Sequence, residues 1–528
     1  MLLKMAGRTL RLRTSNAAPR PTNKTNSVAA KLRWRTTTTT RSLSAATEAD
    51  HPETETASAS ASSTGRMIKP WKTPVVESRG DYRQEAWLEE WIGGPLYEKQ
   101  KNLPRLPVPT VQETLARFMP TAMPLARSQL EQDSLQSAVD CFANQAAVLQ
   151  DRLLDRQVSA ANADSSWLQH WWNTAGYLKV RDSVVVNVSY FFHFSDDATA
   201  SSSNVKRGAA LLSATADYRL SVVTGQLPPD HVGRKEPKTP LCSVAYKYMF
   251  HACRIPVENR DAYRLYDPAL HAHAVVARHG FFFAVPLADA STGHALPLDA
   301  LEASLSECLE SADRLQALPE QEQPYKLGWL TSKNRDDWAH ARDTLLALDP
   351  AIEQDLELLQ SGAVLLCLDD QEPVSLEECG RLFCFGDEQG GNRWFDKSVQ
   401  LFCTENGKAG LMGEHSMMDG MPVTGLANRI TELTYAACQE REASREGSAA
   451  VGKGNRSGAS SVTPIFGNLR KSPQVQDLVE KGTRAWKSKV GKWDGLSLAA
   501  VSSHPLVSFS TRIVQPSKNS PLSCRGKP

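Results

Sequence analysis

The sequence lacks the cysteine pairs that would mark a zinc module or a disulfide scaffold. Its ten cysteines are scattered from Cys141 to Cys524, and no two of them form a C-x-x-C arrangement. Small zinc domains and secreted disulfide frameworks use closely spaced pairs to hold their folds. We therefore exclude both classes and expect a protein of a reducing compartment.

Long hydrophobic runs and a strong net charge are also missing. The longest apolar stretches, such as "GFFFAVPLA" at residues 280–288, are far shorter than the roughly 20 residues that cross a bilayer. The formal net charge of +1 over 528 residues gives no reason to expect a nucleic-acid partner. We expect a soluble protein with no transmembrane segment, made of more than one compact unit.

Acidic residues are absent from the first 47 positions. This stretch is rich in serine and threonine, and it carries ten basic residues before the first acid, Glu48. Such a composition is typical of a mitochondrial presequence, so residues 1–47 are predicted to direct the chain to the mitochondrial matrix or inner membrane. A disordered basic arm that contacts RNA is the alternative. The carboxyl end, "RGKP", has no peroxisomal S-K-L-type signal.

Two polar stretches of low complexity divide the rest of the chain. Residues 48–66 predict a flexible tether, and residues 441–461 predict a flexible linker or insertion. The second stretch contains "GKGNRSG", which lacks the G-x-x-x-x-G-K-[ST] spacing of a phosphate loop. Neither stretch is predicted to carry chemistry.

The pattern between these stretches changes from helical to mixed. Residues 67–165 predict an N-terminal helical segment, in which Thr110 and Glu113 form a capping box. In residues 166–440, β-branched and aromatic runs alternate with helical stretches such as "NRDDWAHARDTLLAL". The runs "DSVVVNVSYFFHF" and "GAVLLCLDD" predict strands, and "HAVVARHGFFFAV" predicts two strands about a turn at Gly280. This alternation indicates an α/β or α+β domain.

A hairpin is predicted around Asn406 and Gly407. The Asn-Gly pair favours a type I′ turn, which needs positive φ at both central residues. Strands at residues 399–404 and 408–414 should flank it. His415 then stands at the exit of the second strand, where a rigid element can aim its side chain.

His415 is the main candidate for a catalytic residue, in the stretch "LMGEHSMMDGMPV". A lone histidine that closes a strand is more often structural than catalytic. Asp419 lies four residues on, where its carboxylate can anchor the turn by pairing with an arginine. A neutral imidazole is also the natural base for taking a proton from an alcohol or a thiol. Both interpretations stay open on the residues alone.

Other polar and aromatic groups give weaker signals. His271 and His273 share a strand face, but no cysteine or acidic ligand is close by, so we predict no metal site. The tryptophans in "SSWLQHWWNTAGYL" favour packing over ligand binding. Arg254 and Arg264 either pair structurally or bind an anion. The glycines in "GDEQGGNRWFDKSV" lack dinucleotide spacing and predict a loop.

Six segments, in order along the chain, resemble the choline/carnitine acyltransferase family, and within it the fungal-type carnitine O-acetyltransferases. The resemblance spans roughly Trp71 to Val423 and weakly includes the helix after Ser472. The segments are "LPRLPVPTVQETLARFMP", "WLQHWWNTAGYLKVRDSVVVNVSYFFHF", "CRIPVENRDAYRLYDP", "HAVVARHGFFF", "LGWLTSKNRDDWAHARDTL" and "GNRWFDKSVQLFCTENGKAGLMGEHSMMDGMPV".

The resemblance implies a fold, a reaction and its residues. The fold would be α/β and similar to chloramphenicol acetyltransferase, with residues 166–440 as the domain that carries the catalytic histidine. His415 would be the general base and Asp419 its acidic neighbour, while Trp172 and Tyr177 would lie at the carnitine site. The family transfers an acyl group directly between coenzyme A and carnitine. We expect a monomer with acetyl-CoA as co-substrate and no tightly bound cofactor.

The chain departs from this family after the histidine. Members continue into a complete second domain, which supplies the lysine-bearing coenzyme A site, a Ser-Thr-Ser stretch and a clamp for the carnitine carboxylate. Only residues 462–494 resemble the start of such a domain. Residues 495–528 predict an irregular tail, whose simplest explanation is a truncated or mispredicted gene model. We expect the chain as written to lack acyl transfer and to expose apolar surface.

Overall fold

The structure is a computed structural model that describes the chain from residue 93 onward, with gaps. The predicted presequence (1–47) and tether (48–66) lie outside the described residues, as do residues 449–461 of the predicted linker. Residues 441–448 of that linker continue helix α14 (Tyr435–Ser448), so this part is helical rather than flexible. The described residues are 93–162, 166–200, 203–233, 238–386, 391–448, 462–467, 469, 471–490, 500–504 and 507–510.

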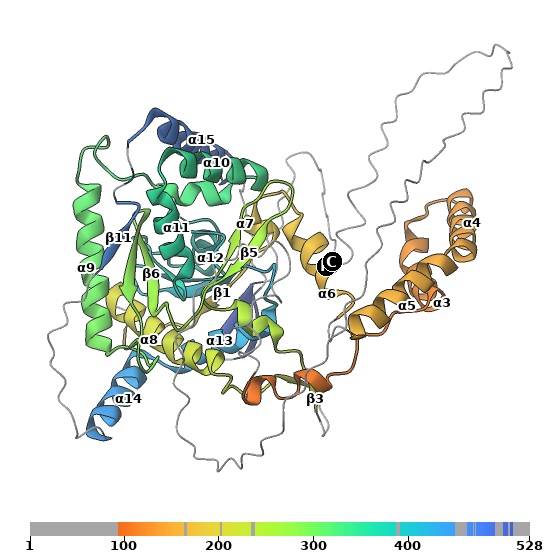
Figure 1. Cartoon of the computed structure of the whole chain (residues 1–528), viewed down its shortest axis with the longest axis horizontal. Coiled ribbons are helices and arrows are strands. Elements are labelled where there is room, and N and C mark those ends of the chain that lie inside the picture. The colour runs from red at the N-terminus through yellow and green to blue at the C-terminus, as the bar shows by residue number, and fades with distance from the viewer. Residues whose placement is uncertain are drawn as a thin grey trace, which may run out of the picture. The chain divides into compact units, whose positions relative to one another are not determined.

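A nine-stranded mixed sheet forms the centre of the fold (Figure 1), in the order β11-β7-β6-β8-β9-β10-β1-β13-β12. Strand β8 pairs in parallel with β6 and β9, and the other neighbours pair antiparallel. This mixed sheet with its helices confirms the predicted α/β class. The strands are β1 (Tyr190–Phe194), β6 (His273–Arg278), β7 (Phe281–Pro286), β8 (Leu365–Leu368), β9 (Val399–Cys403), β10 (Ala409–Gly413), β11 (Thr463–Ile465), β12 (Ala500–His504) and β13 (Val507–Ser510).

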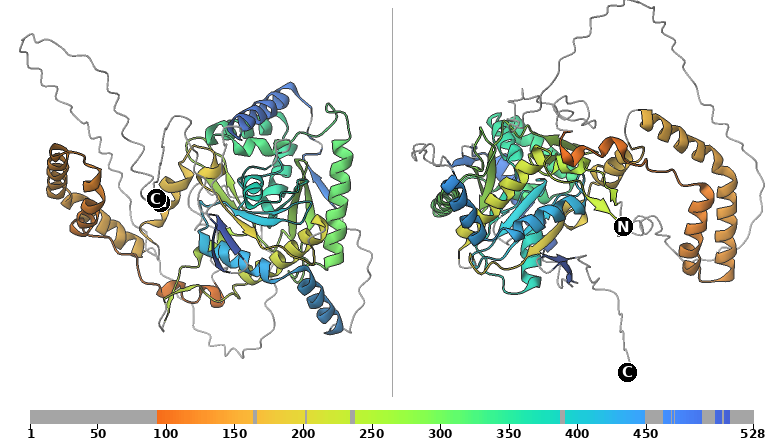
Figure 2. Two further views of the ribbon diagram at one scale, coloured as in Figure 1. Left: turned by 180° about the vertical axis from the view of Figure 1, so that it is seen from behind. Right: turned by 90° about the horizontal axis from the view of Figure 1, so that it is seen from below.

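The two faces of this sheet bury alternate residues of each strand, as the two-residue period of a strand requires. In β1, for example, Phe192 belongs to the core on one face and Phe191 to the core on the other. Helices lie on both faces (Figures 1 and 2). The first core includes side chains of α8 (Asn204–Val223), α9 (Leu298–Gln316), α13 (Gly420–Glu432) and α14. The second includes side chains of α10 (Arg335–Leu348), α11 (Ala351–Ser361), α12 (Leu376–Phe385) and α15 (Pro473–Val490).

The predicted hairpin forms from β9 and β10, but its turn differs from the prediction. Gly407 takes a φ of 78°, whereas Asn406 is not among the positive-φ residues of the described chain. The amide of Gly407 donates to the carbonyl of Thr404, and the amide of Thr404 donates to the carbonyl of Lys408. These bonds close a three-residue loop in which a type I turn is followed by a left-handed glycine. The strands remain in the predicted place.

The strand predictions hold in part. Strands β6 and β7 flank the turn at Gly280, and β8 falls within "GAVLLCLDD", as predicted. The run "DSVVVNVSYFFHF" is a strand only from Tyr190, because Val184–Asn187 form the short helix α7, capped by the hydroxyl of Ser183. Val184 and Val185 of α7 are buried with the second core. Because every residue in such a buried β-branched run is apolar, its pattern does not distinguish a helical turn from a strand.

The first of the N-terminal helices begins where the sequence predicts. Thr110 and Glu113 form the predicted capping box of α3 (Val111–Ala122), which is followed by α4 (Gln129–Gln145) and α5 (Ala147–Asn162). These helices and the short turn after α3 leave many large apolar side chains exposed. The exposed side chains are Phe118, Leu125, Leu130, Phe142, Val148, Leu149, Leu154 and Val158.

The C-terminal segments join the same sheet and core. Helix α15 is capped by Ser472, as predicted, and Trp486 packs with its ring centroid 5.9 Å from that of Trp329. Strands β12 and β13 form in the predicted irregular tail, and β13 pairs with β1 from residue 507 to residue 509. The assignment of residues 462–494 to a second domain stays a prediction.

Three histidines, of which His251 is fully buried and His271 and His273 are half-buried, lie beside α8 and α11. The ring of His251 accepts a hydrogen bond from Arg219 Nε at 2.5 Å, and its Nδ1 lies 2.8 Å from the carbonyl oxygen of Ser361. Burial, together with Arg219, lowers the pKa of His251 well below its usual value. Burial also lowers the pKa of His271 to about 4 and that of His273 to about 4. The three rings are therefore neutral in the folded protein near pH 7.

Acid should destabilise the fold through these histidines. Their pKa values are lower in the folded than in the unfolded state, so the unfolded state binds more protons as the pH falls below about 6.5. Asp267 acts in the opposite direction, because burial raises its pKa to about 6. We expect the midpoint of urea denaturation to fall between pH 7 and pH 5, and to fall less in His273→Asn. Replacing the exposed His294 with Asn should keep the wild-type dependence, and a midpoint that is flat with pH would contradict this account.

Candidate active site

His415 lies in the turn between β10 and α13, at the exit of the predicted hairpin strand. The turn begins directly after β10 ends at Gly413, and Asp419 is the N-cap of α13. The His415 side chain is 19% exposed. Strand β10 of the central sheet and helix α13 therefore hold the two ends of the segment that carries the imidazole, while part of the ring remains accessible.

Asp419 approaches His415, as expected for an acidic neighbour. Its Oδ1 lies 3.3 Å from His415 Nε2 and accepts a hydrogen bond from the Gly420 amide at 2.8 Å. The bond to His415, followed by the Gly420 amide, lowers the pKa of the Asp419 carboxyl. The prediction had paired this carboxylate with an arginine. In the described chain its recorded partners are His415 and the first turn of α13 instead.

Two tyrosine rings flank the imidazole. The ring centroid of Tyr177 lies 5.2 Å from that of His415, and the centroid of Tyr190 lies 4.9 Å away, both in edge contacts. Trp172, in α6 (Gln169–Asn173), makes an edge contact with Tyr177 at 6.2 Å and is 46% exposed. The structure thus brings the predicted Tyr177 to His415 directly and Trp172 through Tyr177. Tyr190 was not predicted.

A buried arginine connects both sides of this site. Arg254, in β4 (Ala252–Ile255), donates to Glu414 Oε1 at 3.1 Å and to the carbonyl oxygen of Tyr177 at 2.9 Å. The other Glu414 oxygen accepts from the backbone and side chain of Ser416. One guanidinium therefore fixes the residue before His415 and the backbone of an aromatic neighbour.

The arginine belongs to a larger buried charge cluster. Asp261 Oδ2 accepts from Arg254 Nε and from Arg335 Nε, each at 2.6 Å, and Arg335 pairs with Asp396 at 2.7 Å. Trp338 completes the cluster by donating to Asp396 at 2.7 Å. Burial acts to raise the pKa of Asp261, but Arg335 and Arg254 outweigh it and hold that pKa below its usual value. The carboxylate is therefore ionised beside Arg254 and Arg335, and Arg181 also pairs with it at 3.1 Å.

The sequence did not reveal this cluster, although it raised structural pairing of Arg254 as one of two alternatives. The structure favours that alternative. Arg264 is the other arginine of that sequence segment. It lies over the ring of Tyr266, with its guanidinium carbon 4.8 Å from the ring centroid. Buried arginines require acidic partners, and a sequence alone does not show which acid meets which arginine.

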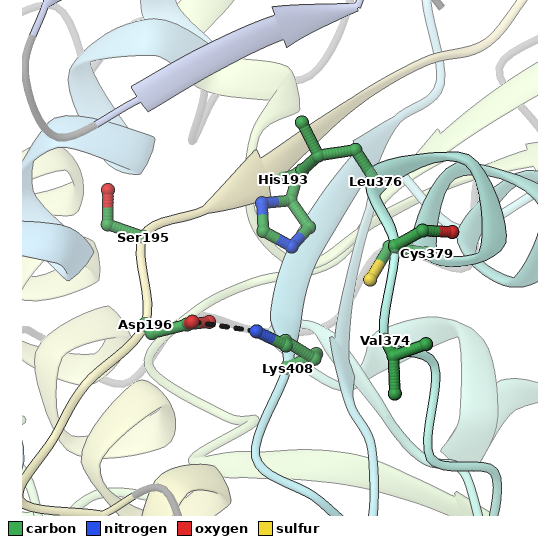
Figure 3. A pocket seen from close by; sticks show the side chains of 8 residues that line it. His193, Ser195, Asp196, Val374, Leu376, Cys379 and Lys408 are labelled. Atoms are coloured by element: carbon green, nitrogen blue, oxygen red, sulfur yellow. Dashed lines mark hydrogen bonds and ion pairs between the residues drawn. The ribbon is translucent and has the colours of Figure 1, made fainter.

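A polar pocket of about 320 Å³ lies at the other end of β1 (Figure 3). His193 faces Gly410 of β10 in the strand register, whereas Tyr190 faces Gly413 next to the His415 turn. Lys408 and Asp196 pair across the pocket at 2.6 Å, and His193 Nε2 is buried without a hydrogen-bond partner. The strand register therefore separates this pocket from His415.

His271 and His273, the other histidines considered as ligands, make contacts within the fold. His273 Nε2 lies 2.8 Å from the carbonyl oxygen of Leu358, and the rings of His271 and His273 meet edge to face. Over the ranges that the structure describes, no three histidine, cysteine or acidic side chains come together as a metal-ligand group. In the same ranges, no helix combines the length and apolar character needed to span a bilayer.

The His415 imidazole lies beside the Asp419 carboxylate and contacts two tyrosine rings. These features define a candidate general-base site. The sequence profile of the choline/carnitine O-acyltransferases matches residues 106–484, well over half of the chain. The chain therefore belongs to the choline/carnitine O-acyltransferase family, as the sequence motifs indicated, and its large mixed sheet is consistent with a chloramphenicol-acetyltransferase-like fold.

Named relatives include carnitine acyltransferases of different acyl groups. The chain is 30% identical to the mitochondrial carnitine O-acetyltransferase of Saccharomyces cerevisiae, over 64% of this chain and 49% of that protein. It is 28% identical to the human carnitine O-acetyltransferase, over 63% and 53% of the two chains. It is 27% identical to the mitochondrial carnitine O-palmitoyltransferase 2 of Rattus norvegicus, over 71% and 59%. The chain thus spans about half the length of these relatives.

Removing the central arginine should cost much of the stability of the fold. We expect Arg254→Met to lower the free energy of unfolding by about 3–5 kcal/mol, because it leaves Glu414 buried without its arginine and removes one of the arginines that pair with Asp261. Arg314 is the control, since its side chain is 67% exposed and pairs with Glu310 on the surface of α9. Arg314→Met should change stability little. Urea denaturation measures both, and similar small losses in the two variants would contradict the role of the cluster.

Proposed function

We propose that this chain carries the histidine half of a carnitine O-acyltransferase site, with acetyl as the acyl group and His415 as the general base. The observation that supports this most is the His415 turn itself, with Asp419 3.3 Å from the imidazole and two tyrosine rings beside it. The names of the yeast and human relatives supply the reaction and the acetyl group.

In this proposal the imidazole takes the proton from the hydroxyl of carnitine. The resulting alkoxide attacks the thioester carbonyl of acetyl-CoA and forms a tetrahedral intermediate. When the carbon–sulfur bond breaks, the imidazolium returns its proton to the sulfur, so acetylcarnitine and free coenzyme A leave. The reverse reaction begins with the thiol. Such a base contributes roughly a hundred- to ten-thousandfold in rate, and positioning and oxyanion donors supply much of the rest.

Trp172 and Tyr177 are proposed to receive carnitine. Carnitine carries a quaternary ammonium group, and the faces of tryptophan and tyrosine attract such cations. Trp172 is 46% exposed, and Tyr177 connects it to His415. This arrangement supports a path from an accessible aromatic surface to the base. Coenzyme A is proposed as a co-substrate that leaves after each turnover.

Two alternatives belong to other classes. The first is a non-catalytic protein that binds an acyl ligand or a partner. The second is another acyltransferase with the same H-x-x-x-D-G arrangement but a different acceptor. Release of thiol without dependence on carnitine would favour the second alternative. A longer open reading frame beyond residue 489 would count against the first.

The catalytic role of His415 is tested by thiol release from acetyl-CoA, with and without carnitine. In a longer form that carries the second half of the yeast relative, we expect His415→Ala to lower turnover by about 10²–10⁴-fold with little change in carnitine affinity. Asp419→Asn should cost less, because it loosens the turn but keeps the base. Equal turnover in His415→Ala would refute the assignment. For the 528-residue chain we expect no carnitine-dependent release, and robust release would overturn that expectation.

The location of the protein is proposed to be mitochondrial, on the acid-free composition of residues 1–47 and the name of the yeast relative. Residues 1–47 fused to a fluorescent protein should direct it to mitochondria. A control in which the arginines of this segment are replaced by glutamine should remain in the cytosol. Cytosolic or nuclear fluorescence of the unmodified fusion would count against the presequence.

A further inference from the structure

Tyr190 and Gly413 face each other in the strand pair that leads to His415. Tyr190 begins β1, Gly413 ends β10, and the two are direct partners in the antiparallel register. A Cβ atom built on Gly413 would lie 2.8 Å from both Cζ and Oη of Tyr190, which is closer than real Cβ contacts allow. The phenol of Tyr190 therefore occupies the space that any side chain at residue 413 would need.

The same phenol contacts both ends of the His415 turn. Its ring lies edge to face with the imidazole, with centroids 4.9 Å apart and an angle of 85° between the planes. Its hydroxyl donates to the backbone carbonyl of Asp419 at 3.3 Å. One side chain from β1 thus spans from the candidate base to the N-cap of α13.

The surroundings keep this phenol in its neutral form. Burial, followed by the charges of Asp419 and Glu414, raises the pKa of Tyr190 well above its usual value. A neutral phenol retains its proton and so continues to donate to the Asp419 carbonyl. A phenolate beside two carboxylates would be repelled from this position.

We propose that Tyr190 is a positioning residue, which orients the His415 imidazole for proton transfer, and that Gly413 is glycine because it admits the Tyr190 ring. The inference rests on the proposed function, since it takes His415 to be the base. The imidazole makes edge contacts with the rings of both Tyr190 and Tyr177, and the Tyr177 centroid lies 5.2 Å away. A ring confined in this way samples fewer rotamers, which is what a base needs to meet its proton in one geometry.

The test uses the 528-residue chain and does not require turnover. Diethyl pyrocarbonate acylates accessible unprotonated imidazoles, and mass spectrometry of the peptide around residue 415 gives the rate for His415. The variants are Tyr190→Phe, Tyr190→Leu, Gly413→Ala and the double variant Gly413→Ala/Tyr190→Leu. The exposed His294 serves as the internal reference, and urea denaturation shows that each variant is folded.

We expect Tyr190→Leu to raise the rate of His415 modification by roughly 2- to 10-fold, because the free energy of one aromatic contact corresponds to a rate change of about that size. Tyr190→Phe keeps the ring and should stay within about twofold of wild type. Gly413→Ala should raise the rate by displacing the phenol, but it should add nothing in the Tyr190→Leu background. Should Tyr190→Leu fail to fold, the contrast between Tyr190→Phe and Gly413→Ala carries the same test.

Three results would overturn the inference. One is an unchanged His415 rate in Tyr190→Leu, another is a rate in Tyr190→Phe as high as in Tyr190→Leu, and the third is an effect of Gly413→Ala that persists without Tyr190. In a form with carnitine-dependent turnover, a positioning role also predicts that Tyr190→Leu lowers kcat with little change in KM. Failure of the proposed function would appear separately, as turnover that survives His415→Ala.

Discussion

The buried guanidinium of Arg254 is the constraint on which the candidate site depends. A fully buried charge is costly unless ionised partners and hydrogen bonds surround it. Arg254 meets this requirement with Asp261, Glu414 and the carbonyl oxygen of Tyr177. Because each partner lies in a different segment of the chain, the charge requirement also sets where these segments meet. The residue before His415 and the backbone of Tyr177 are held by the same side chain.

The sheet supplies the second half of the geometry. The β9–β10 hairpin carries His415 to one end of the sheet, and β1 pairs beside β10 so that Tyr190 reaches the same end. The Tyr190 ring, packed against β10, leaves no room for a side chain at Gly413. The site is thus built on β1, β10 and the N-terminus of α13, while part of the imidazole and of Trp172 remains exposed. A base held in this way has little freedom left to lose when a substrate arrives.

Local chemistry explains which parts of this arrangement could be predicted. The capping box at Thr110 and the hairpin at Gly407 follow from bonds between residues a few positions apart, so the sequence is sufficient to predict them. His415 and Asp419 were found because they share one turn, and Trp172 and Tyr177 because the family motif includes them. The type I′ turn at Asn406 was wrong because a three-residue loop also accepts Asn-Gly, with only the glycine left-handed.

Long-range pairings explain the rest. The partners Arg254 and Glu414 are 160 positions apart, and nothing local indicates which of the many acids meets this arginine. Tyr190 lies in a run of aromatic residues with no polar alternation, so the sequence does not show which face of the sheet its side chain is on. The start of β1 was also predicted too early, within the preceding valines. If Arg254 holds the site together, Arg254→Lys should speed amide hydrogen exchange in peptides covering both residues 411–420 and residues 174–180, while the β6–β7 hairpin keeps its protection. Unchanged exchange in residues 411–420, or equal loss of protection throughout the sheet, would contradict this account.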